Sequence, residues 1–458
     1  MKRKTLGHMA VMMIICLGML LSGCKKYLEI KSDSRLVVPS TLSDVQGLLD
    51  DANLMNLRTC PSFGDASSDD IFLPLAGYNA IGVTGQEAYT WRPTPYRFGN
   101  DWQTGYLAVY NCNLSLELLN NIDRIGPNAQ FWDNAKGSAL FFRSYYFLML
   151  TSQYGLAYDE ASSASELGIA LRTTSDFNVP SKRATVKESY QQVINDALQS
   201  MDLLPDYPQH PLRPSKGAAA ALLSRCYLYM RKYDLALKYA TDALKFNNKL
   251  MNFNGDSDLL ALTSNVPVKK FNKETIWYAE LYTSFGITNL TRSRVDSVLY
   301  SSYNTNDLRK TAFFKIAAPY QQFKGSYAAS ATVCFSGFAT DELYLTSAES
   351  KAAVGDITGA MEDLNTLMKT RWKSTVAFVP FSAVDKNDAL KKIRDERRKE
   401  LLLRGLRFAD IKRYNKEGEG IILKRIVDGK TYTLLPESKY YALPLPTDVI
   451  ESSGMPQN

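Results

Sequence analysis

Residues 217–246 read GAAAALLSRCYLYMRKYDLALKYATDALKF, and this stretch decides the fold class. Its first half, 217–230, is rich in alanine and leucine and contains no proline, which favours a helix. Residues 231–234, RKYD, follow as a tight turn, and 235–246 again carry apolar residues at helical spacing. Small side chains at Ala236, Ala240 and Ala243 let the second helix approach the first closely. The stretch therefore predicts a pair of packed helices.

The same design recurs elsewhere in the chain. Residues 341–371, DELYLTSAESKAAVGDITGAMEDLNTLMKTR, place two helical patterns around a turn at Gly355 and Asp356. Residues 188–205 supply another second helix behind a helix at 135–155 that is apolar nearly all round. These pairs resemble the tetratricopeptide helix-turn-helix unit, which buries its faces only by stacking on neighbouring units. The predicted fold class is mainly α, a tetratricopeptide-like α-α superhelix.

The remaining chain divides into two kinds of segment. Helices are also expected at 40–55 and 102–122, where apolar residues recur at helical spacing. Residues 60–100 and 250–340 are instead rich in Gly, Ser, Thr, Asn and aromatic residues, and loops of this length are usually functional. We expect a single domain over 24–458, with a helical scaffold at about 40–60, 100–250 and 340–415 and a loop-rich ligand-binding region at about 60–100 and 250–340.

The first 23 residues have the pattern of a signal peptide. A basic start at residues 2–4 precedes an apolar run from Met9 to Leu21, which is too short to span a bilayer. Residues 21–24, Leu-Ser-Gly-Cys, resemble the bacterial lipoprotein box, in which the chain is cut before the cysteine and that cysteine is acylated. The resemblance predicts removal of 1–23 and a lipid anchor at Cys24. An uncleaved anchor, or a plain secretory leader with a chance cysteine, is the alternative.

Composition narrows the functional classes. The full chain carries a net charge of +7, and loss of the three basic residues of the leader leaves 51 Lys and Arg against 47 Asp and Glu, so 51 − 47 = +4. This charge is small for a nucleic-acid-binding protein of this length. The chain has only two histidines, and His8 leaves with the leader, so His210 is the one that remains. A histidine-based metal site or a serine triad is therefore disfavoured.

Cysteine and acidic residues give weak signals for metals. The spacing of the cysteines matches no zinc pattern, and Cys112 and Cys226 lie in helical patterns, where small buried thiols are expected. The pairing state of the cysteines of the folded body is not readable from the sequence: Cys60, Cys112, Cys226 and Cys334. Asp65, Asp69 and Asp70 in GDASSDD offer a calcium site, but Asx-turns and helix caps explain such clusters more often. We expect no cofactor.

A charged stretch near the end of the chain, IRDERRKELLLRGLRFADIKRY (393–414), is predicted to be partly buried. The three leucines at 401–403 face every side of a turn, so this part of the chain must be enclosed. Some of the neighbouring charged residues are then enclosed too, and buried charges persist only when they are paired and hydrogen-bonded. We interpret Arg394, Glu396, Arg397, Arg398 and Glu400 as a structural ion-pair network, with a catalytic carboxylate pair as the alternative.

This stretch also resembles a family signature. Its pattern R-x-E-R-R-x-E-L-x-x-x-G-x-R-F-x-D-I-K-R-Y is similar to that of the SusD/RagB family, the nutrient-binding outer-membrane lipoproteins of Bacteroidetes. Other segments agree in order, from CKKYLEIKSDSR at 24–35 and ALFFRSYYFLMLTSQYG at 139–155 to YYALPLPTDVIESSGMPQN at 440–458. Ser453-Gly454-Met455 departs from the Asn-Pro usual in the family tail. The resemblance covers essentially the whole mature chain.

The resemblance implies a function in nutrient uptake. Family members sit over a SusC-like TonB-dependent β-barrel as a lid anchored in the outer membrane on the cell surface, and they bind glycan or peptide without catalysis. Sugars present apolar ring faces and hydroxyl edges, which suit flat aromatic side chains and polar neighbours. The loop GYNAIGVTGQEAYTWRPTPYRFGND (77–101) and the segment ELYTSFG (280–286) are rich in such side chains. The predicted ligand-binding residues are Trp91, Arg92, Tyr96, Tyr78, Tyr282 and Phe285.

The sequence is compatible with several hypotheses about function. In the first hypothesis the ligand is a glycan, and in the second it is a peptide, as in the RagB branch. In the third, the chain is an assembly protein that holds a partner in tetratricopeptide grooves. A hydrolase is disfavoured because no histidine, nucleophile elbow or metal motif is present, although a glycosidase carboxylate pair needs no local motif. The aromatic side chains could also serve only to pin long loops to the helical body.

Overall fold

The computed structural model describes residues 39–458. Within this part, Thr41–Asn458 pack as one unit around a shared apolar core. The predicted leader at 1–23 and the predicted lipidation site at Cys24 lie outside the described residues. None of the helices in the described part combines the length and apolar character needed to cross a bilayer.

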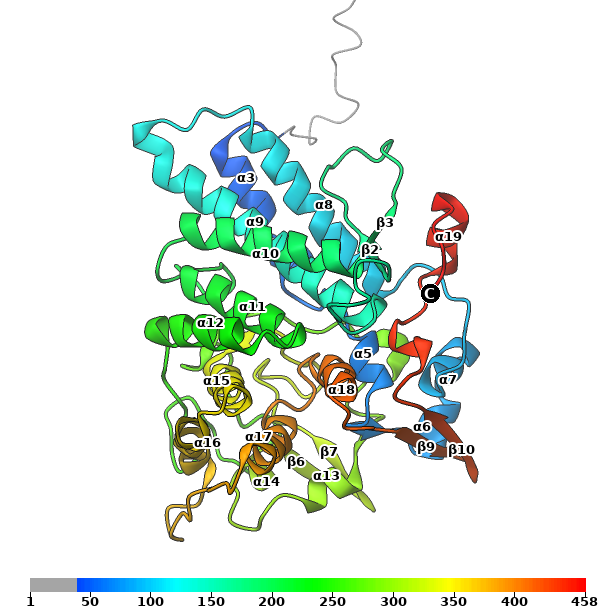
Figure 1. Ribbon diagram of the computed structural model, residues 1–458, viewed down its shortest axis with the longest axis vertical. Helices are drawn as coiled ribbons and strands as arrows, with labels where there is room; N and C mark the ends of the chain where they lie inside the picture. Colours follow the sequence, from blue (N-terminus) through cyan, green and yellow to red (C-terminus); the bar gives the residue numbers. More distant parts are fainter. Residues whose placement is uncertain (1–38) are drawn as a thin grey trace, which may run out of the picture. The chain divides into compact units, whose positions relative to one another are not determined.

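Helices dominate the structure, and the prediction of a mainly α fold is confirmed. Neighbouring scaffold helices pack in sequence, from α8 on α9 through α10, α11 and α12 to α15, which contacts both α16 and α17. Figure 1 shows these layers following one another down the view. The scaffold helices are α3 (Leu42–Leu49), α4 (Ala52–Met55), α8 (Asp101–Leu119), α9 (Ala129–Tyr154), α10 (Val186–Leu203), α11 (Lys216–Tyr229), α12 (Tyr233–Phe246), α15 (Thr340–Val354), α16 (Ile357–Arg371), α17 (Lys386–Glu400) and α18 (Arg407–Lys416).

Local sequence sets the ends of these helices. Thr41 and Thr185 begin α3 and α10, each with a reciprocal capping box to the third residue of the helix. Helix α15 ends at Gly355, whose φ of 99° lies in the left-handed region that glycine adopts without strain. Asp356 then caps α16 through its side chain. The predicted turn between these two helices is therefore confirmed.

The predicted single helix at 40–55 is wrong, because two aspartates divide it. Helix α3 ends at Leu49 with Asp50 as its C-cap, and α4 starts immediately afterwards. The Asp51 carboxylate accepts a hydrogen bond of 3.1 Å from the Asn53 N–H. Aspartate side chains compete with the helix for backbone donors, so they favour caps over helix interiors.

Helix α9 forms the centre of the core. Its residues from Gly137 to Tyr154 are all buried, which agrees with the prediction of an apolar surface nearly all round. The polar ends of its tyrosines find partners: the hydroxyl of Tyr145 donates to the carbonyl of Ser336 (3.0 Å), and that of Tyr154 to the Asp101 carboxylate (3.0 Å). Buried tyrosine hydroxyls usually have such partners.

The loop-rich part contains more regular structure than the sequence predicts. Short helices and strands interrupt both predicted loop regions. Every strand of the described residues pairs with one antiparallel neighbour, in the combinations β1–β5, β2–β3, β4–β8, β6–β7 and β9–β10. The short elements are α5 (Phe63–Ser67), β1 (Ile71–Phe72), α6 (Leu75–Asn79), α7 (Val83–Tyr89), η1 (Gly126–Asn128), β2 (Leu167–Ala170), β3 (Arg183–Thr185), β4 (Thr275–Trp277), η2 (Ser284–Gly286), β5 (Arg294–Val295), α13 (Ser297–Ser301), α14 (Arg309–Ala312), β6 (Phe314–Ala317), β7 (Tyr320–Phe323), β8 (Phe338–Ala339), η3 (Lys439–Tyr441) and α19 (Thr447–Ser453).

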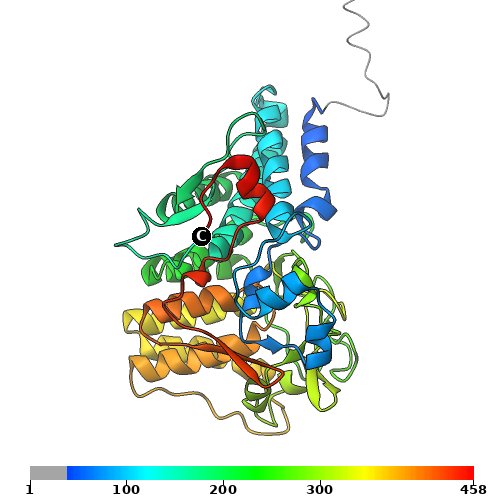
Figure 2. The same cartoon turned by 90° about the vertical axis from the view of Figure 1, so that its right-hand side faces the viewer.

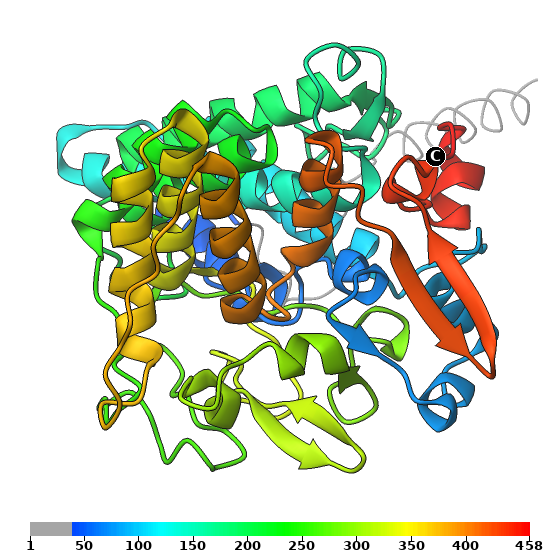
Figure 3. The ribbon, with the colours of Figure 1, turned by 60° about the horizontal axis from the view of Figure 1, so that its bottom comes forward.

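A hairpin near the C-terminus was missed by the sequence analysis. Strands β9 (Leu423–Val427) and β10 (Lys430–Leu434) are joined by Asp428 and Gly429, which both have positive φ (47° and 74°). An Asp-Gly pair of this kind is the usual signal for a two-residue hairpin. Figure 2 and Figure 3 show the hairpin beside α6 and α7. It brings C-terminal residues to the predicted ligand-binding loop.

The charged stretch at 393–414 forms the predicted structural network. Both oxygens of Glu400, a residue only 2% exposed, are paired, with Arg371 at 2.7 Å and Arg309 at 2.9 Å. Arg371 also pairs with Glu274 at 2.9 Å. Helix α17 ends at Glu400, and the three leucines at 401–403 follow it as a buried turn. The network joins α14, α16 and α17 to the loop before β4.

Candidate functional site

A cavity of about 600 Å³ lies between the predicted ligand-binding loop and the end of the chain. We call it the tail cavity. Its size falls within the range of small-molecule sites, about 300–1,000 Å³. It is lined by Trp91, Pro93, Thr94, Pro95, Ser438, Lys439, Tyr440, Ala442, Pro444, Thr447, Gln457 and Asn458.

Trp91 forms part of the cavity wall but is otherwise held firmly by the protein. Only 7% of this residue is exposed, and its indole N–H donates to the carbonyl of Ser67 at 3.0 Å. The guanidinium of Arg425, from the hairpin, lies 4.6 Å from the Trp91 ring and 3.9 Å from that of Tyr89. The φ of Trp91 is 54°, a left-handed value that is rare for a bulky side chain. The ring is thus fixed in place before any ligand arrives.

Tyr96 fastens the loop to the C-terminal tail. Its hydroxyl donates to the carbonyl of Pro444 (2.7 Å), and its own carbonyl accepts from the Thr447 N–H (2.7 Å). Its ring lies edge-on to Phe285 at 5.3 Å. Nearby, the Tyr282 hydroxyl donates to the carbonyl of Gly99 (3.0 Å). Among these predicted ligand-binding residues, none lines the tail cavity.

Tyr78 and Arg92 do not line the tail cavity, although Arg92 directly follows Trp91 in the chain. Tyr78 is partly buried, and its ring lies 5.8 Å from that of Tyr89. Burial raises the pKa of Tyr78, Tyr432 of the hairpin adds to the rise, and Arg92 opposes it. Arg92 is exposed, and its Nε donates to the hydroxyl of Thr90 at 3.2 Å. Neither side chain therefore joins Trp91 in lining the cavity.

The end of the chain is docked closely against the body. The side-chain amide of Gln457 exchanges hydrogen bonds with the backbone of Leu445 (2.7 and 2.9 Å). Asn458 donates to the carbonyl of Tyr154 at the end of α9 (3.0 Å). Helix α19 ends at Gly454, whose φ is 67°, within the segment that departs from the family tail. The tail therefore docks against the body even though residues 453–455 differ from the family sequence.

Tyr440 is one of several cavity residues that sequence reasoning missed. Its hydroxyl is buried and has no hydrogen-bond partner among residues 39–458. Burial raises the pKa of this phenol well above its ordinary range, so it is a neutral donor at physiological pH. Buried polar groups nearly always have partners, so this enclosed, lone hydroxyl of a lining residue is a candidate contact for a ligand that enters the cavity. The sequence offered only the aromatic pair YY at 440–441 as a signal.

The chemistry of the cavity lining suits binding. Hydroxyl, amide and ammonium groups alternate with proline and aromatic surfaces, and the lining side chains include no Asp, Glu, His or Cys. A glycosidase needs two carboxyl groups facing each other across the substrate. Glu87, which does not line the cavity, accepts a hydrogen bond of 2.6 Å from the hydroxyl of the lining residue Thr94. The lining can therefore hold a neutral polar molecule.

Acidic clusters elsewhere are occupied by arginine. Glu274, Asp341 and Glu400 lie close enough to one another to share an ion, but Arg371 and other arginines pair with them. Burial would raise the pKa of Glu400, yet the arginines outweigh burial and lower it to about 2. In the cluster GDASSDD, Asp69 is paired with Arg407 at 2.7 Å. Glu274, Asp341, Glu400 and Asp69 therefore have arginine partners.

Two family models match different parts of the chain. Residues 26–228 match a family model described as starch-binding and associating with the outer membrane. Residues 298–451 match the model of the SusD family. Among functionally curated proteins, no match was found.

Solved structures share the fold over nearly the whole chain. A Bacteroides vulgatus protein aligns with a TM-score of 0.74 at 22% identity, over 92% of this chain and 99% of its own. A SusD superfamily protein from Bacteroides thetaiotaomicron has a TM-score of 0.72 at 20% identity, over 91% and 99%. A SusD-like carbohydrate binding protein from Bacteroides vulgatus has a TM-score of 0.64 at 20% identity, over 91% and 97%. The two family matches, which together span most of the chain, show that it belongs to the SusD/RagB family.

Proposed function

We propose that the protein is a nutrient-binding lipoprotein that captures glycans in the tail cavity. The single observation that carries the proposal is the lining of this cavity, where a fixed tryptophan and three prolines accompany a tyrosine whose buried hydroxyl has no partner in the described residues. Flat apolar surfaces match the faces of sugar rings, and hydroxyl and amide groups match their edges. The printed description of one structural relative, a carbohydrate binding protein, supports the same ligand class.

Pre-organisation gives the proposed site its affinity. Because Arg425 and Ser67 already hold Trp91, ligand binding would not have to order this ring. Each side chain that a ligand must immobilise costs about 0.5–1.5 kcal/mol of binding free energy. A site fixed in advance avoids that cost and can still release its cargo, since its contacts are few.

We also propose that the protein acts on the cell surface with a TonB-dependent outer-membrane transporter. Support comes from the resemblance of 21–24 to a lipoprotein box and from the family description, which mentions association with the outer membrane. Labelling of cells with a palmitate analogue should mark the wild type and not Cys24→Ala. Labelling that persists in the variant would contradict the anchor. Affinity purification of the tagged wild type from detergent-solubilised membranes should recover a large β-barrel, and its absence would contradict the partnership.

The glycan proposal is tested by Tyr440→Phe, which removes one hydroxyl and keeps the ring. Loss of one neutral hydrogen bond should lower glycan affinity about two- to tenfold. The measurement is calorimetric titration of leaderless protein with malto-, cello-, xylo-, manno- and fructo-oligosaccharides and with unstructured peptides. The melting temperature should stay unchanged, because the hydroxyl has no partner in residues 39–458.

Tyr441→Phe is the matched control. This neighbouring hydroxyl accepts from Asn415 and does not line the tail cavity, so its loss should leave glycan affinity unchanged. Equal effects of the two substitutions would contradict the proposed site. Binding of peptides and of no oligosaccharide would replace the glycan with a peptide ligand, as in the RagB branch of the family.

A further inference from the structure

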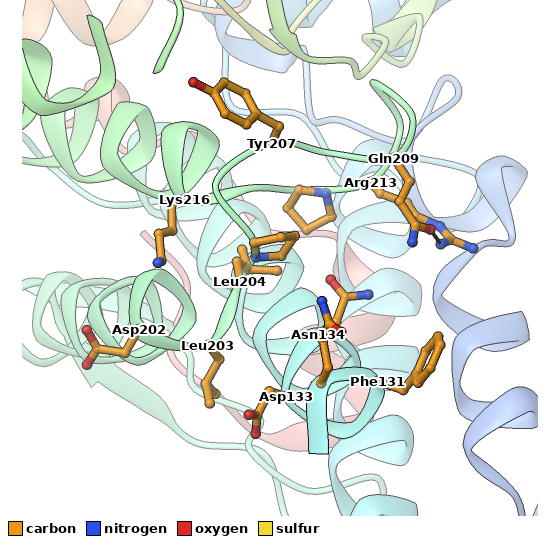
Figure 4. Close-up of a pocket in the computed structure, with 13 residues that line it drawn as sticks. Phe131, Asp133, Asn134, Asp202, Leu203, Leu204, Tyr207, Gln209, Arg213 and Lys216 are labelled. Carbon is orange, nitrogen blue, oxygen red and sulfur yellow. Dashed lines mark hydrogen bonds between the residues drawn. The ribbon is translucent and has the colours of Figure 1, made fainter. Parts of the chain in front are cut away.

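A second pocket, of about 610 Å³, opens at the far end of α9 from the tail cavity. We call it the interhelix pocket. It lies between the start of α9, the end of α10 and the link from α10 to α11. Its lining consists of Gln130, Phe131, Asp133, Asn134, Asp202, Leu203, Leu204, Pro205, Tyr207, Gln209, Arg213, Pro214 and Lys216. Figure 4 shows Tyr207 and Phe131 at different edges of the hollow, with Asn134 and Leu204 between them.

The charges around the interhelix pocket balance. Asp133 and Asp202 stand against Arg213 and Lys216, so the lining carries no net charge. Most of these charges already have partners: Arg213 pairs with Asp50 at 2.5 Å, and Lys216 with a neighbouring aspartate at 3.0 Å. A pocket for a phosphate, a polyanion or a cation would show an excess of the opposite sign. The lining therefore suits a neutral ligand.

Three side-chain amides give the pocket donors and acceptors together. Gln130, Asn134 and Gln209 each carry a carbonyl oxygen and an NH₂ group, which match hydroxyls that both donate and accept. The side chains of Gln130 and Asp202 have no partner among residues 39–458, so they are available to a ligand. A ligand rich in hydroxyl groups fits this set better than an apolar one.

Two aromatic rings stand exposed at the pocket. Phe131 is 67% exposed and Tyr207 is 66% exposed, both unusually high for rings of this size. Between them the pocket is lined by Leu204, Pro205 and Pro214, so apolar surface alternates with the amides. Apolar faces with hydroxyl edges are the chemistry of a saccharide, and both features meet here.

We propose that the interhelix pocket is a second saccharide-binding site, which acts together with the tail cavity on one glycan chain. The inference rests on the proposed glycan function. Helix α9 has 26 residues and is about 39 Å long at 1.5 Å per residue. Asn458 of the tail cavity contacts Tyr154 at one end of this helix, and Gln130 lies at the other. A short oligosaccharide binds at each site separately, whereas a long polysaccharide engages both and gains avidity.

The test uses the double variant Phe131→Ala, Tyr207→Ala of the leaderless protein. Both rings are exposed, so their removal should leave the melting temperature unchanged. The probes are the hexasaccharides of the maltose, cellobiose, xylose and mannose series, and the matching polysaccharides in an immobilised form. Calorimetry should give two bound hexasaccharides per wild-type molecule and one per double variant. Retention on the polysaccharide should fall about tenfold or more in the variant, because avidity is lost.

Phe177→Ala is the matched control, since this ring is 81% exposed and does not line the pocket. It should keep both the stoichiometry and the retention of the wild type. One bound hexasaccharide in the wild type, or two in the double variant, would overturn the second site and leave glycan capture intact. If none of the saccharides bound the wild type, both the glycan function and this inference would fall.

Discussion

Arg425 holds the side chain of Trp91, a predicted ligand contact, in its position. Its guanidinium donates to the carbonyls of Ala66 and Ser68 (2.7 and 2.8 Å) and also to that of Tyr89, while its face covers the rings of Tyr89 and Trp91. In the described residues its acceptors are carbonyls and none is a carboxylate, and burial lowers its pKa. Arginine suits this place because its planar fork serves several acceptors and stacks on rings.

The first prediction concerns Arg425→Lys. A lysine ammonium cannot reach all three carbonyls or stack on both rings, so buried acceptors are left unsatisfied. The free energy of unfolding should fall by about 2–4 kcal/mol in urea titrations. Glycan affinity should fall as well, because Trp91 loses its support. Arg92→Lys, at an exposed position nearby, should change neither quantity, and an equal effect there would contradict the assigned role.

Asp65 gives a prediction about pH. It is 2% exposed, one of its oxygens accepts from the Gly405 N–H (2.8 Å), and the other has no partner among residues 39–458. Burial raises its pKa to about 7, and Asp70 adds to the rise. Since the folded protein holds this proton more tightly than the unfolded chain, the contribution of Asp65 to stability falls as pH rises from about 4 to 7.

Asp65→Asn should remove that contribution while an amide oxygen still accepts from Gly405. The variant should be more stable than the wild type at pH 8, by on the order of 1–4 kcal/mol, and the difference should shrink toward pH 4. Urea unfolding across this pH range measures the difference. Asp123→Asn, at an exposed position, should show no such trend. A difference that grows toward low pH would contradict the assignment.

Sequence reasoning anticipated the burial of the network residues but not that of Trp91. Arg397 and Glu400 were expected to be enclosed because leucines surround them, and they are. Trp91 was chosen because its loop lacks core periodicity, yet long-range partners bury it. Such partners cannot be read from local spacing. A signal did exist in the strand LKRIV (423–427). Arg425 lies two residues from Leu423 and two from Val427, so all three side chains point to the same, buried face.

At the scale of elements, buried ion pairs hold regular helices to irregular segments. Arg371 ends α16, Glu400 ends α17 and Arg309 begins α14, so the network is a joint between three helix termini. Helix patterns, caps and turns were predictable because they depend on neighbours in sequence. The short strands were not, because pairs such as β1 with β5 join segments about two hundred residues apart.

The prediction at this scale concerns Arg371→Met. The change would leave Glu274 without its arginine partner and weaken the pairing of Glu400, both buried. Breaking a buried pair by removing one partner costs about 3–5 kcal/mol. Urea unfolding should show a loss of this size. Arg124→Met removes an exposed pair with Asp133 and should cost about 1 kcal/mol or less. Similar losses would contradict a structural network.

At the scale of the whole molecule, the C-terminal tail closes the candidate site over a loop from the first quarter of the chain. Thr447 bonds to Tyr96, and Gln457 and Asn458 line the tail cavity. The family signature predicted the fold class for nearly the whole chain. It did not predict the cavity, because the cavity exists only where these distant segments meet.

Deletion of residues 456–458 tests this closure. The deletion removes two lining residues and the bonds from Gln457 and Asn458 to Leu445 and Tyr154. Glycan affinity should fall about tenfold or more, and amide hydrogen exchange at 91–96 should rise, while the far-ultraviolet circular dichroism stays unchanged. Glu451→Gln, which breaks only an exposed pair with Arg97, should leave all three unchanged. Unaltered glycan affinity in the deletion would contradict the role of the tail.

The cysteines of the described part have a practical consequence. Cys60, Cys112, Cys226 and Cys334 are all buried and unpaired, and burial raises the pKa of the Cys60 thiol to about 12. A thiol reacts as its thiolate, so these groups stay inert while the chain is folded. Folding of this part needs no oxidant, and reducing agents would not weaken it. The four thiols can instead be used to measure unfolding. The rate at which a maleimide dye labels them would report how often the core opens.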